Sequence, residues 1–139
     1  MTKIHVFLNF NNQAEEAMKF YAELFDSEIS GLSRVSDMPN AADFPKEVQN
    51  KVFWSELKLE NLDLYGCDTG LFGAIAAPVS TIPNQYLNLM PETREEADRF
   101  FASLSEGGQV LVPLEVQMFG AYYGRLVDKY GIGWDIYTE

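Results

Sequence analysis

Residues 15–24 read EEAMKFYAEL, and residues 95–104 read EEADRFFASL. Aligned without gaps, the two segments are identical at six positions, and two further positions keep a basic charge or an aromatic ring. Apolar residues recur in both segments at the spacing of one helix face, so each predicts an amphipathic helix. The chain therefore contains the same unit twice, and this repeat decides the fold class.

The ends of both helices carry signals of their own. Asn11 or Asn12 is the expected N-cap of the first helix, because a short polar side chain can accept from the free N–H groups there. Thr93 and Glu96 stand at capping-box spacing at the start of the second helix. A Gly-Gly pair at 107–108 follows it, and glycine readily takes the left-handed conformation that ends a helix.

Strand-like segments repeat around the two helices. IHVFLNF (4–10) and YLNLM (86–90) alternate apolar residues with a second set, which is the spacing of a strand that feeds a helix. Further strands are expected at 28–35, 52–59 and 62–67 after the first helix, and at 109–115, 119–127 and 132–137 after the second. The sequence thus predicts an α+β fold of two tandem βαβββ modules, 1–68 and 84–139, joined by a Gly-, Ala- and Pro-rich linker at 69–83.

One such module buries too little surface to be stable alone, so the two modules are expected to pack together. With the helices on the outer face, the other sheet face can curl into a cup in one mixed sheet. The residues that alternate with the core set are expected to line this cup and bind a ligand. They are His5, Phe7, Asn9, Trp54, Asp63, Tyr65, Cys67, Tyr86, Asn88, Asp135 and Tyr137.

The composition excludes several classes of function. The chain has 139 residues and a formal net charge of −11, which would repel a phosphate backbone, so no nucleic-acid partner is expected. Cys67 is the single cysteine, which excludes an internal disulfide and favours a reducing compartment. No apolar run has the length of a membrane span, and the first residues do not read as a signal peptide. A cytoplasmic protein without a membrane partner is the prediction.

Three segments together resemble a known superfamily. They are FNNQAEEAMKFYAELFDSEI (10–29), EEADRFFASLSEGGQV (95–110) and FGAYYGRLVDKYGIGWDIY (119–137). The last carries a spaced pattern, Gly120, Gly124, Asp128, Gly131 and Trp134. The chain resembles the vicinal oxygen chelate superfamily of glyoxalase I, extradiol dioxygenases, fosfomycin-resistance enzymes and bleomycin-binding proteins. It is most similar to the PhnB-like branch, also labelled demethylubiquinone methyltransferase-like. The resemblance implies one domain over 1–139 and a homodimer.

The resemblance also allows a test for a metal site. Glyoxalase-like relatives take a metal ligand from the first and last strand of each module, and His5 and Asp135 match two of these places. The first module's last strand offers only Asp63, Tyr65 or Cys67, and the second module's first strand offers Tyr86, which is a poor ligand. No metal cofactor is therefore expected, although a divalent metal held by His5 and Asp135 is the alternative. A methyltransferase would need a glycine-rich strand-to-helix turn in a larger sheet, so that activity is rejected.

Three functions stay open. The first, which we favour, is a protein that binds a small aromatic or amphipathic compound in the cup without metal-dependent catalysis. The second is a metal-dependent enzyme of the glyoxalase, dioxygenase or fosfomycin-transferase type that uses His5 and Asp135. The third is a protein that acts mainly by association, through Leu71 and Phe72 of the linker and the edge FGAYYG. No catalytic residue is assigned, so whether the chain is an enzyme is left open.

Overall fold

A computed structural model describes residues 2–69 and 83–139. The chain divides into two compact units, Met1–Ala77 and Pro78–Glu139, and each is described by itself. The expected linker at 69–83 lies outside the described residues except for its first and last positions, and so do Leu71 and Phe72. No helix in the described part of the chain is both long enough and apolar enough to cross a membrane.

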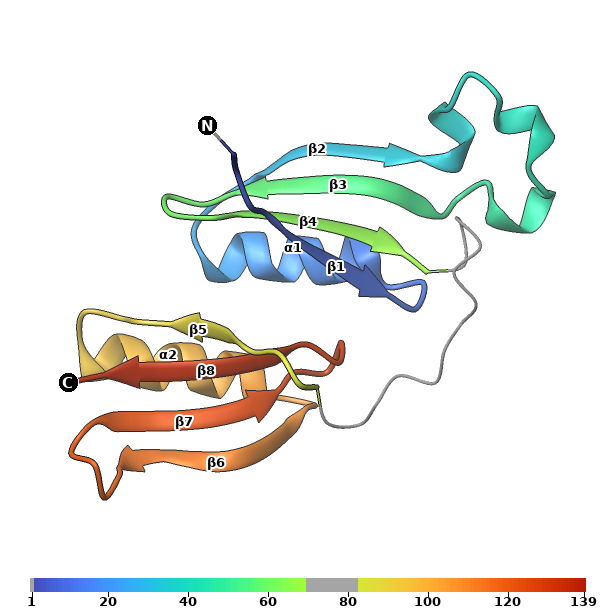
Figure 1. Cartoon of the computed structure of the whole chain (residues 1–139). Helices are drawn as coiled ribbons and strands as arrows, with labels where there is room; N and C mark the ends of the chain where they lie inside the picture. The colour runs from blue at the N-terminus through green and yellow to red at the C-terminus, as the bar shows by residue number, and fades with distance from the viewer. Residues whose placement is uncertain (1, 70–82) are drawn as a thin grey trace. The chain divides into compact units, whose positions relative to one another are not determined.

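The first unit is a four-stranded sheet with one helix against it (Figure 1). Its elements are β1 (Val6–Phe10), α1 (Ala14–Leu24), β2 (Ile29–Arg34), β3 (Val52–Lys58) and β4 (Asp63–Asp68). The strands lie in the order β1-β4-β3-β2, with β1 parallel to β4 and the other pairs antiparallel. Three short 3-10 turns occupy the connection between β2 and β3, which extends beyond the sheet in Figure 1. They are η1 (Val35–Asp37), η2 (Ala41–Asp43) and η3 (Lys46–Val48).

The second unit repeats this plan. Its elements are β5 (Leu87–Leu89), α2 (Arg94–Ser105), β6 (Gln109–Val116), β7 (Tyr122–Val127) and β8 (Gly133–Thr138). The strand order is β5-β8-β7-β6, with β5 parallel to β8 and the other pairs antiparallel. The predicted α+β fold of two tandem βαβββ modules is therefore confirmed. Hydrogen bonding divides the described strands into two four-stranded sheets, and the cup shared by both modules stays a prediction.

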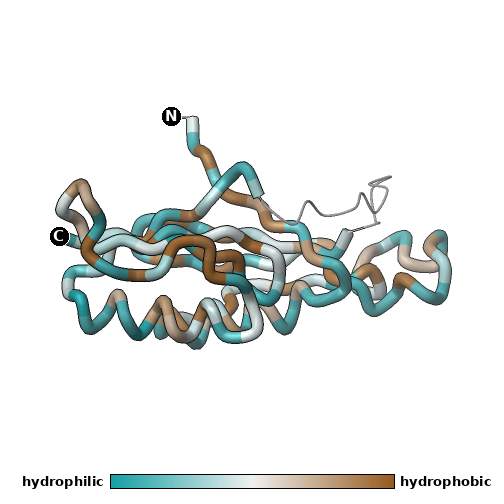
Figure 2. The backbone as a smooth tube through the Cα atoms, turned by 90° about the horizontal axis from the view of Figure 1, so that it is seen from below, coloured by the Kyte–Doolittle hydropathy of each residue, from teal (hydrophilic) through white to brown (hydrophobic). Residues whose placement is uncertain are grey.

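Each helix covers one face of its own sheet. Along the backbone, apolar and polar residues alternate in both helices and strands, so each element has an apolar side to bury (Figure 2). In the first unit the buried residues include Leu8, Phe10, Ala14, Ala17, Met18, Tyr21, Leu57 and Leu64. In the second unit they include Ala97, Phe100, Leu104, Leu126, Trp134 and Ile136. The alternate strand residues point to the opposite face of each sheet, which we call the open face.

The two helices begin in different ways. Thr93 is the N-cap of α2 as predicted, and its Oγ1 accepts from the backbone N–H of Glu96 at 3.1 Å. The prediction of Asn11 or Asn12 as the cap of α1 is wrong: that position is taken by Gln13, whose side chain makes no capping hydrogen bond. Asn12 instead turns the chain with a φ of 60°. In an asparagine this left-handed conformation is tolerated, and it moves the helix start one residue onward.

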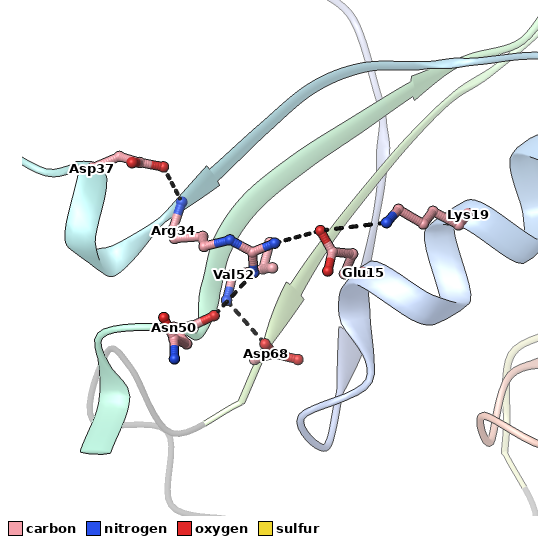
Figure 3. Close-up of polar contacts among 7 residues, drawn as sticks. All are labelled: Glu15, Lys19, Arg34, Asp37, Asn50, Val52 and Asp68. Carbon is pink, nitrogen blue, oxygen red and sulfur yellow. Dashed lines mark hydrogen bonds and ion pairs between the residues drawn. The ribbon is translucent and has the colours of Figure 1, made fainter. Parts of the chain in front are cut away.

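A distant carboxylate takes over the missing cap. Asp68, at the end of β4, accepts from the N–H of Ala14 through Oδ1 at 3.0 Å and from the N–H of Val52 through Oδ2 at 2.9 Å. Its side chain is buried, with 6% of the residue exposed. Figure 3 shows the bond to Val52. One carboxylate therefore fixes the start of α1, the start of β3 and the end of β4 together, and its negative charge suits a helix N-terminus.

Arg34 performs a similar role beside it. Its guanidinium pairs with the Glu15 carboxylate on α1 and donates from Nη1 to the Asn50 carbonyl at 3.2 Å (Figure 3). Its backbone N–H donates to Asp37 Oδ2 at 2.9 Å. Arg34 thereby links both ends of the long β2–β3 connection to each other and to α1.

Candidate functional site

The open face of the first sheet collects seven of the predicted cup residues. Cross-strand pairing sets Phe7 opposite Tyr65 and Asn9 opposite Cys67 on the parallel strands β1 and β4. Leu8 and Leu64, which alternate with them, are buried. The remaining members are His5, just before β1, Trp54 on β3 and Asp63 on β4. The alternation predicted from sequence therefore places these side chains on one face of the first unit.

Aromatic rings surround Tyr65 on this face. The centroid of the Tyr65 ring lies 5.2 Å from His5 in an edge-on arrangement, 5.8 Å from Phe7 in a stacked one and 6.2 Å from Trp54 in a tilted one. These four residues are the Tyr65 cluster. Phe7 is 48% exposed, and Trp54 and Tyr65 are half-buried. The sheet thus presents a continuous aromatic surface rather than isolated rings.

A glycine on the neighbouring strand makes room for this surface. A Cβ atom on Gly31 of β2 would lie 2.6 Å from the Trp54 ring, closer than real side chains approach. The absence of a side chain therefore lets the indole lie across β2.

Glu56 completes the polar edge of the cluster, and the sequence analysis missed it. It is the cross-strand partner of Tyr65, and Ser30 Oγ donates to Glu56 Oε1 at 2.7 Å. The hydrogen bond from Ser30 is the main cause that lowers the pKa of Glu56. Burial, followed by Glu56, raises the pKa of Tyr65. Strand parity could have found Glu56, since it lies two residues after Trp54 on β3.

His5 and Asp63 lie at the end of the same face. His5 Nδ1 is 3.9 Å from Asp63 Oδ2, with the two side chains 34% and 28% exposed. Both residues line an open depression of about 310 Å³ where the chain enters β1 and turns between β3 and β4. The full lining is Lys3, Ile4, His5, Leu59, Glu60, Asn61, Leu62 and Asp63. The depression therefore adjoins the Tyr65 cluster, because His5 belongs to both.

Cys67 is buried, with 7% of the residue exposed, and its Sγ donates to Asn9 Oδ1 at 3.2 Å. Burial and the neighbouring Asp68 carboxylate raise the pKa of the thiol. Only the thiolate is a good nucleophile, so this cysteine is poorly placed for chemistry at neutral pH.

The open face of the second sheet is built around an ion pair. Arg125 on β7 donates from Nε and Nη2 to the two oxygens of Asp135 on β8, at 2.7 and 2.9 Å. The guanidinium carbon lies 3.9 Å from the centroid of the Tyr86 ring. The hydrogen bonds to Asp135 raise the pKa of Arg125, so this residue stays charged. The sequence analysis missed Arg125, although the alternation along the expected strand 119–127 could have assigned it to this face.

The other predicted residues of this unit lie nearby. Asn88 is the cross-strand neighbour of Asp135 on β5, and Tyr137 is the partner of Tyr123 on β7. Burial is the main cause that raises the pKa of Tyr123, and the negative charge of Asp135 adds to it. This face thus combines one half-buried ion pair with tyrosine side chains.

The side chains offered for a metal do not fit one. Both oxygens of Asp135 accept from Arg125, and His5 lies in the other unit with its Nδ1 toward Asp63. Across 2–69 and 83–139, no group of three or more His, Cys, Asp or Glu side chains is arranged to hold a metal ion. A site with His5 and Asp135 would have to break the Arg125 pair and recruit further donors.

Comparison with known proteins gives a consistent result. The family model described as 3-demethylubiquinone-9 3-methyltransferase matches residues 2–137. None of the curated proteins compared with the chain matches it. Among solved structures, protein PA1353 from Pseudomonas aeruginosa is 25% identical with a TM-score of 0.84, and the match covers 100% of this chain and 98% of that one.

A second structure is similar over its whole length. The putative 3-demethylubiquinone-9 3-methyltransferase, PhnB protein, from Bacillus cereus is 30% identical, with a TM-score of 0.81 and coverage of 99% and 100%. A glyoxalase family protein from Enterococcus faecalis is 21% identical, with a TM-score of 0.60 and coverage of 99% and 98%. This last likeness shows a shared fold.

Proposed function

The chain belongs to the family described as 3-demethylubiquinone-9 3-methyltransferase, which includes PhnB-like proteins of the glyoxalase fold, and on this premise we propose that it binds a small aromatic or amphipathic compound without metal-dependent catalysis. The observation that carries the proposal is the Tyr65 cluster. Its rings lie on the face of the first sheet that helix α1 does not cover. Ligand sites are typically apolar and aromatic surfaces with a few polar groups that fix orientation. Glu56 and Asp63 are such groups here.

The energetics favour a planar or apolar ligand. A ring laid on Tyr65 and Phe7 removes apolar surface from water, which contributes about 25 cal/mol for each Å² buried. Offset or edge contacts between rings add roughly 0.5–1.5 kcal/mol each. These rings are held by the sheet and by each other, so little side-chain entropy is lost when a ligand binds.

Methyl transfer is not part of the proposal, despite the family's description. A dinucleotide or nucleoside cofactor is commonly held where a glycine-rich turn leads from a strand into a helix. Here β1 leads into α1 through Asn11, Asn12 and Gln13, and β5 leads into α2 through MPET (90–93), so neither turn contains glycine. Each sheet also has only four strands.

The test is binding of the neutral fluorescent probe N-phenyl-1-naphthylamine. Replacing Tyr65 by Leu or Trp54 by Ala is expected to weaken binding about ten-fold or more, a loss of about 1.4 kcal/mol, because each removes a ring from the surface. Tyr65→Phe keeps the ring and should bind within about two-fold of the parent, as should His5→Ala. Phe119→Ala is the matched control, since Phe119 is an exposed ring of the other unit. Equal affinity in all variants would refute the site.

The metal-dependent alternative is tested on the same preparation. Protein purified without added metal is expected to contain well under one equivalent of Zn, Ni, Mn or Fe by elemental analysis. Stoichiometric metal with metal-dependent turnover of a glyoxal hemithioacetal, a catechol or a fosfomycin-like epoxide would reverse the ranking.

Homodimer formation and a cytoplasmic location stay predictions. A mass near 15.7 kDa by light scattering at micromolar concentration would contradict the dimer.

A further inference from the structure

Two carboxylates lie close to Tyr65 on the open face of the first sheet. Glu56 is the cross-strand partner of Tyr65, and Asp63 lies two residues before it on the same strand and the same face. The Glu56 side chain is 14% exposed and the Asp63 side chain 28%. Negative charge is thus placed beside the aromatic surface, where Lys58 on β3 pairs with Glu56 at 3.7 Å and lies opposite Asp63.

We infer that the ligand of the Tyr65 cluster is an organic cation, namely an ammonium group attached to an aromatic or apolar body. The inference rests on the proposed function and names its ligand class. The face of a Tyr, Trp or Phe ring has negative electrostatic potential and attracts a cation placed over it, most strongly in Trp. A carboxylate next to such rings adds charge complementarity to the same ligand.

Asp63 is the carboxylate best placed to receive the ammonium group. Glu56 already has Ser30 as a hydrogen-bond donor and Lys58 Nζ at 3.7 Å. Within the described residues, the ion-pair partner of Asp63 is His5, at the longer distance of 3.9 Å, and histidine carries a charge only when protonated. Lys58 lies opposite Asp63 in the β3–β4 pair, but its Nζ pairs with Glu56, so within the described residues Asp63 has no lysine or arginine at ion-pair distance.

The depression beside His5 supplies the space for the charged group. Asp63 and Glu60 are its two acidic lining residues, Lys3 is its one basic lining residue, and His5 joins it to the rings. An ammonium in the depression near Asp63 allows the apolar body to extend over Tyr65 and Phe7. The formal net charge of −11 acts in the same direction, since it concentrates cations near the surface and repels anions.

Three small probes with the same phenyl ring distinguish the contribution of the charge to affinity from that of the ring. Benzyltrimethylammonium, benzyl alcohol and phenylacetate each carry a phenyl ring, with a positive charge, no charge and a negative charge respectively. Their affinities can be measured by NMR titration in sodium phosphate, which contains no competing organic cation. Benzyltrimethylammonium is expected to bind about ten-fold more tightly than benzyl alcohol, and phenylacetate most weakly. Raising the salt from about 20 mM to about 500 mM should weaken the cation and leave benzyl alcohol unchanged.

Two matched substitutions locate the effect. Asp63→Asn is expected to lower the affinity for benzyltrimethylammonium about five-fold or more and to change that for benzyl alcohol by less than about two-fold. Glu23→Gln removes the same charge from the exposed side of α1 and should change neither affinity by more than about two-fold. The loss must be larger for Asp63→Asn than for Glu23→Gln, because a general effect of net charge would make the two equal.

The outcomes distinguish this inference from the proposed function. If benzyl alcohol and the cation bind equally and Tyr65→Leu weakens both, the cation preference is refuted and aromatic binding survives. If the cation binds and Asp63→Asn has no effect, the assignment to Asp63 is refuted. If no probe perturbs the resonances of the Tyr65 cluster, both proposals fail.

Discussion

Arg125 and Asp135 lie on adjacent strands as direct partners, and the guanidinium holds both carboxylate oxygens, through Nε at 2.7 Å and Nη2 at 2.9 Å. This two-point geometry is the strongest form of a side-chain ion pair. It sits on the ring of Tyr86, so the charge is also supported by a cation–π contact at 3.9 Å. Asp135, which the resemblance matches to a metal-ligand position, is therefore paired with Arg125 in this chain.

We expect a double-mutant cycle to measure this pair. Arg125→Met, Asp135→Asn and the double variant should give a coupling free energy of about 1 kcal/mol in urea unfolding. The value is modest because the Arg125 side chain is 36% exposed, so solvent screens part of the attraction. Arg125→Met combined with Glu95→Gln, an exposed residue on α2, serves as the control and should be additive within about 0.5 kcal/mol. Zero coupling between Arg125 and Asp135 would contradict the pairing.

Asp68→Ala should be among the most destabilising changes in the first unit. It leaves the buried N–H groups of Ala14 and Val52 without their acceptor, and an unsatisfied buried donor costs about 1–3 kcal/mol. The expected loss in the free energy of unfolding is about 2–4 kcal/mol, measured by urea denaturation. Asp43→Ala removes an exposed carboxylate from η2 and should stay within about 0.5 kcal/mol of the parent. Equal stability of the two variants would rule out this role for Asp68.

The two helix starts predict unequal effects of the same kind of substitution. Thr93→Ala removes the side-chain oxygen that accepts from Glu96, and loss of an N-cap costs about 1 kcal/mol. Gln13→Ala removes a side chain that makes no capping bond, so less than about 0.5 kcal/mol is expected. Thermal and urea unfolding of both variants test the difference. A larger loss for Gln13→Ala than for Thr93→Ala would show that the assignment of the caps is wrong.

Cys67 should react slowly with thiol reagents. Burial first, and Asp68 second, raise the pKa of the thiol, so the reactive thiolate is scarce near neutral pH. Alkylation by iodoacetamide is expected to be about ten-fold or more slower than that of N-acetylcysteine. Because the pKa is raised, the protein's rate should still climb with pH after the rate of N-acetylcysteine has levelled off. The single cysteine makes the product unambiguous by mass spectrometry.

Unfolding provides the control for the Cys67 measurement. In concentrated urea the thiol leaves its buried site, and its rate should approach that of N-acetylcysteine. If the folded and unfolded chains react at the same rate, the thiol is not protected by the fold.

Local pattern was enough to predict the repeated architecture. The repeat EEAMKFYAEL and EEADRFFASL encodes α1 and α2 within one residue at each end, and the alternation along residues 4–10 assigns Phe7 and Asn9 to the face opposite Leu8. Helix and strand periods arise from residues close together in the chain, so sequence alone carries them. The α2 cap at Thr93 was predictable for the same reason, since its donor lies three residues away.

Only the tertiary structure decided which polar side chains meet. The acceptor for the first N–H of α1 is Asp68, which lies 54 positions further along the chain, and no local signal at Asn11 or Asn12 could indicate it. Likewise, the alternation of residues along the last strand placed Asp135 on the open face, but only the pairing of β7 with β8 set Arg125 directly opposite it. Cross-strand register joins segments that are distant in sequence, and a shift of one residue would turn each of these side chains to the other face. The sequence therefore determined the elements and their faces, whereas the register of the folded sheets determined the contacts that occupy them.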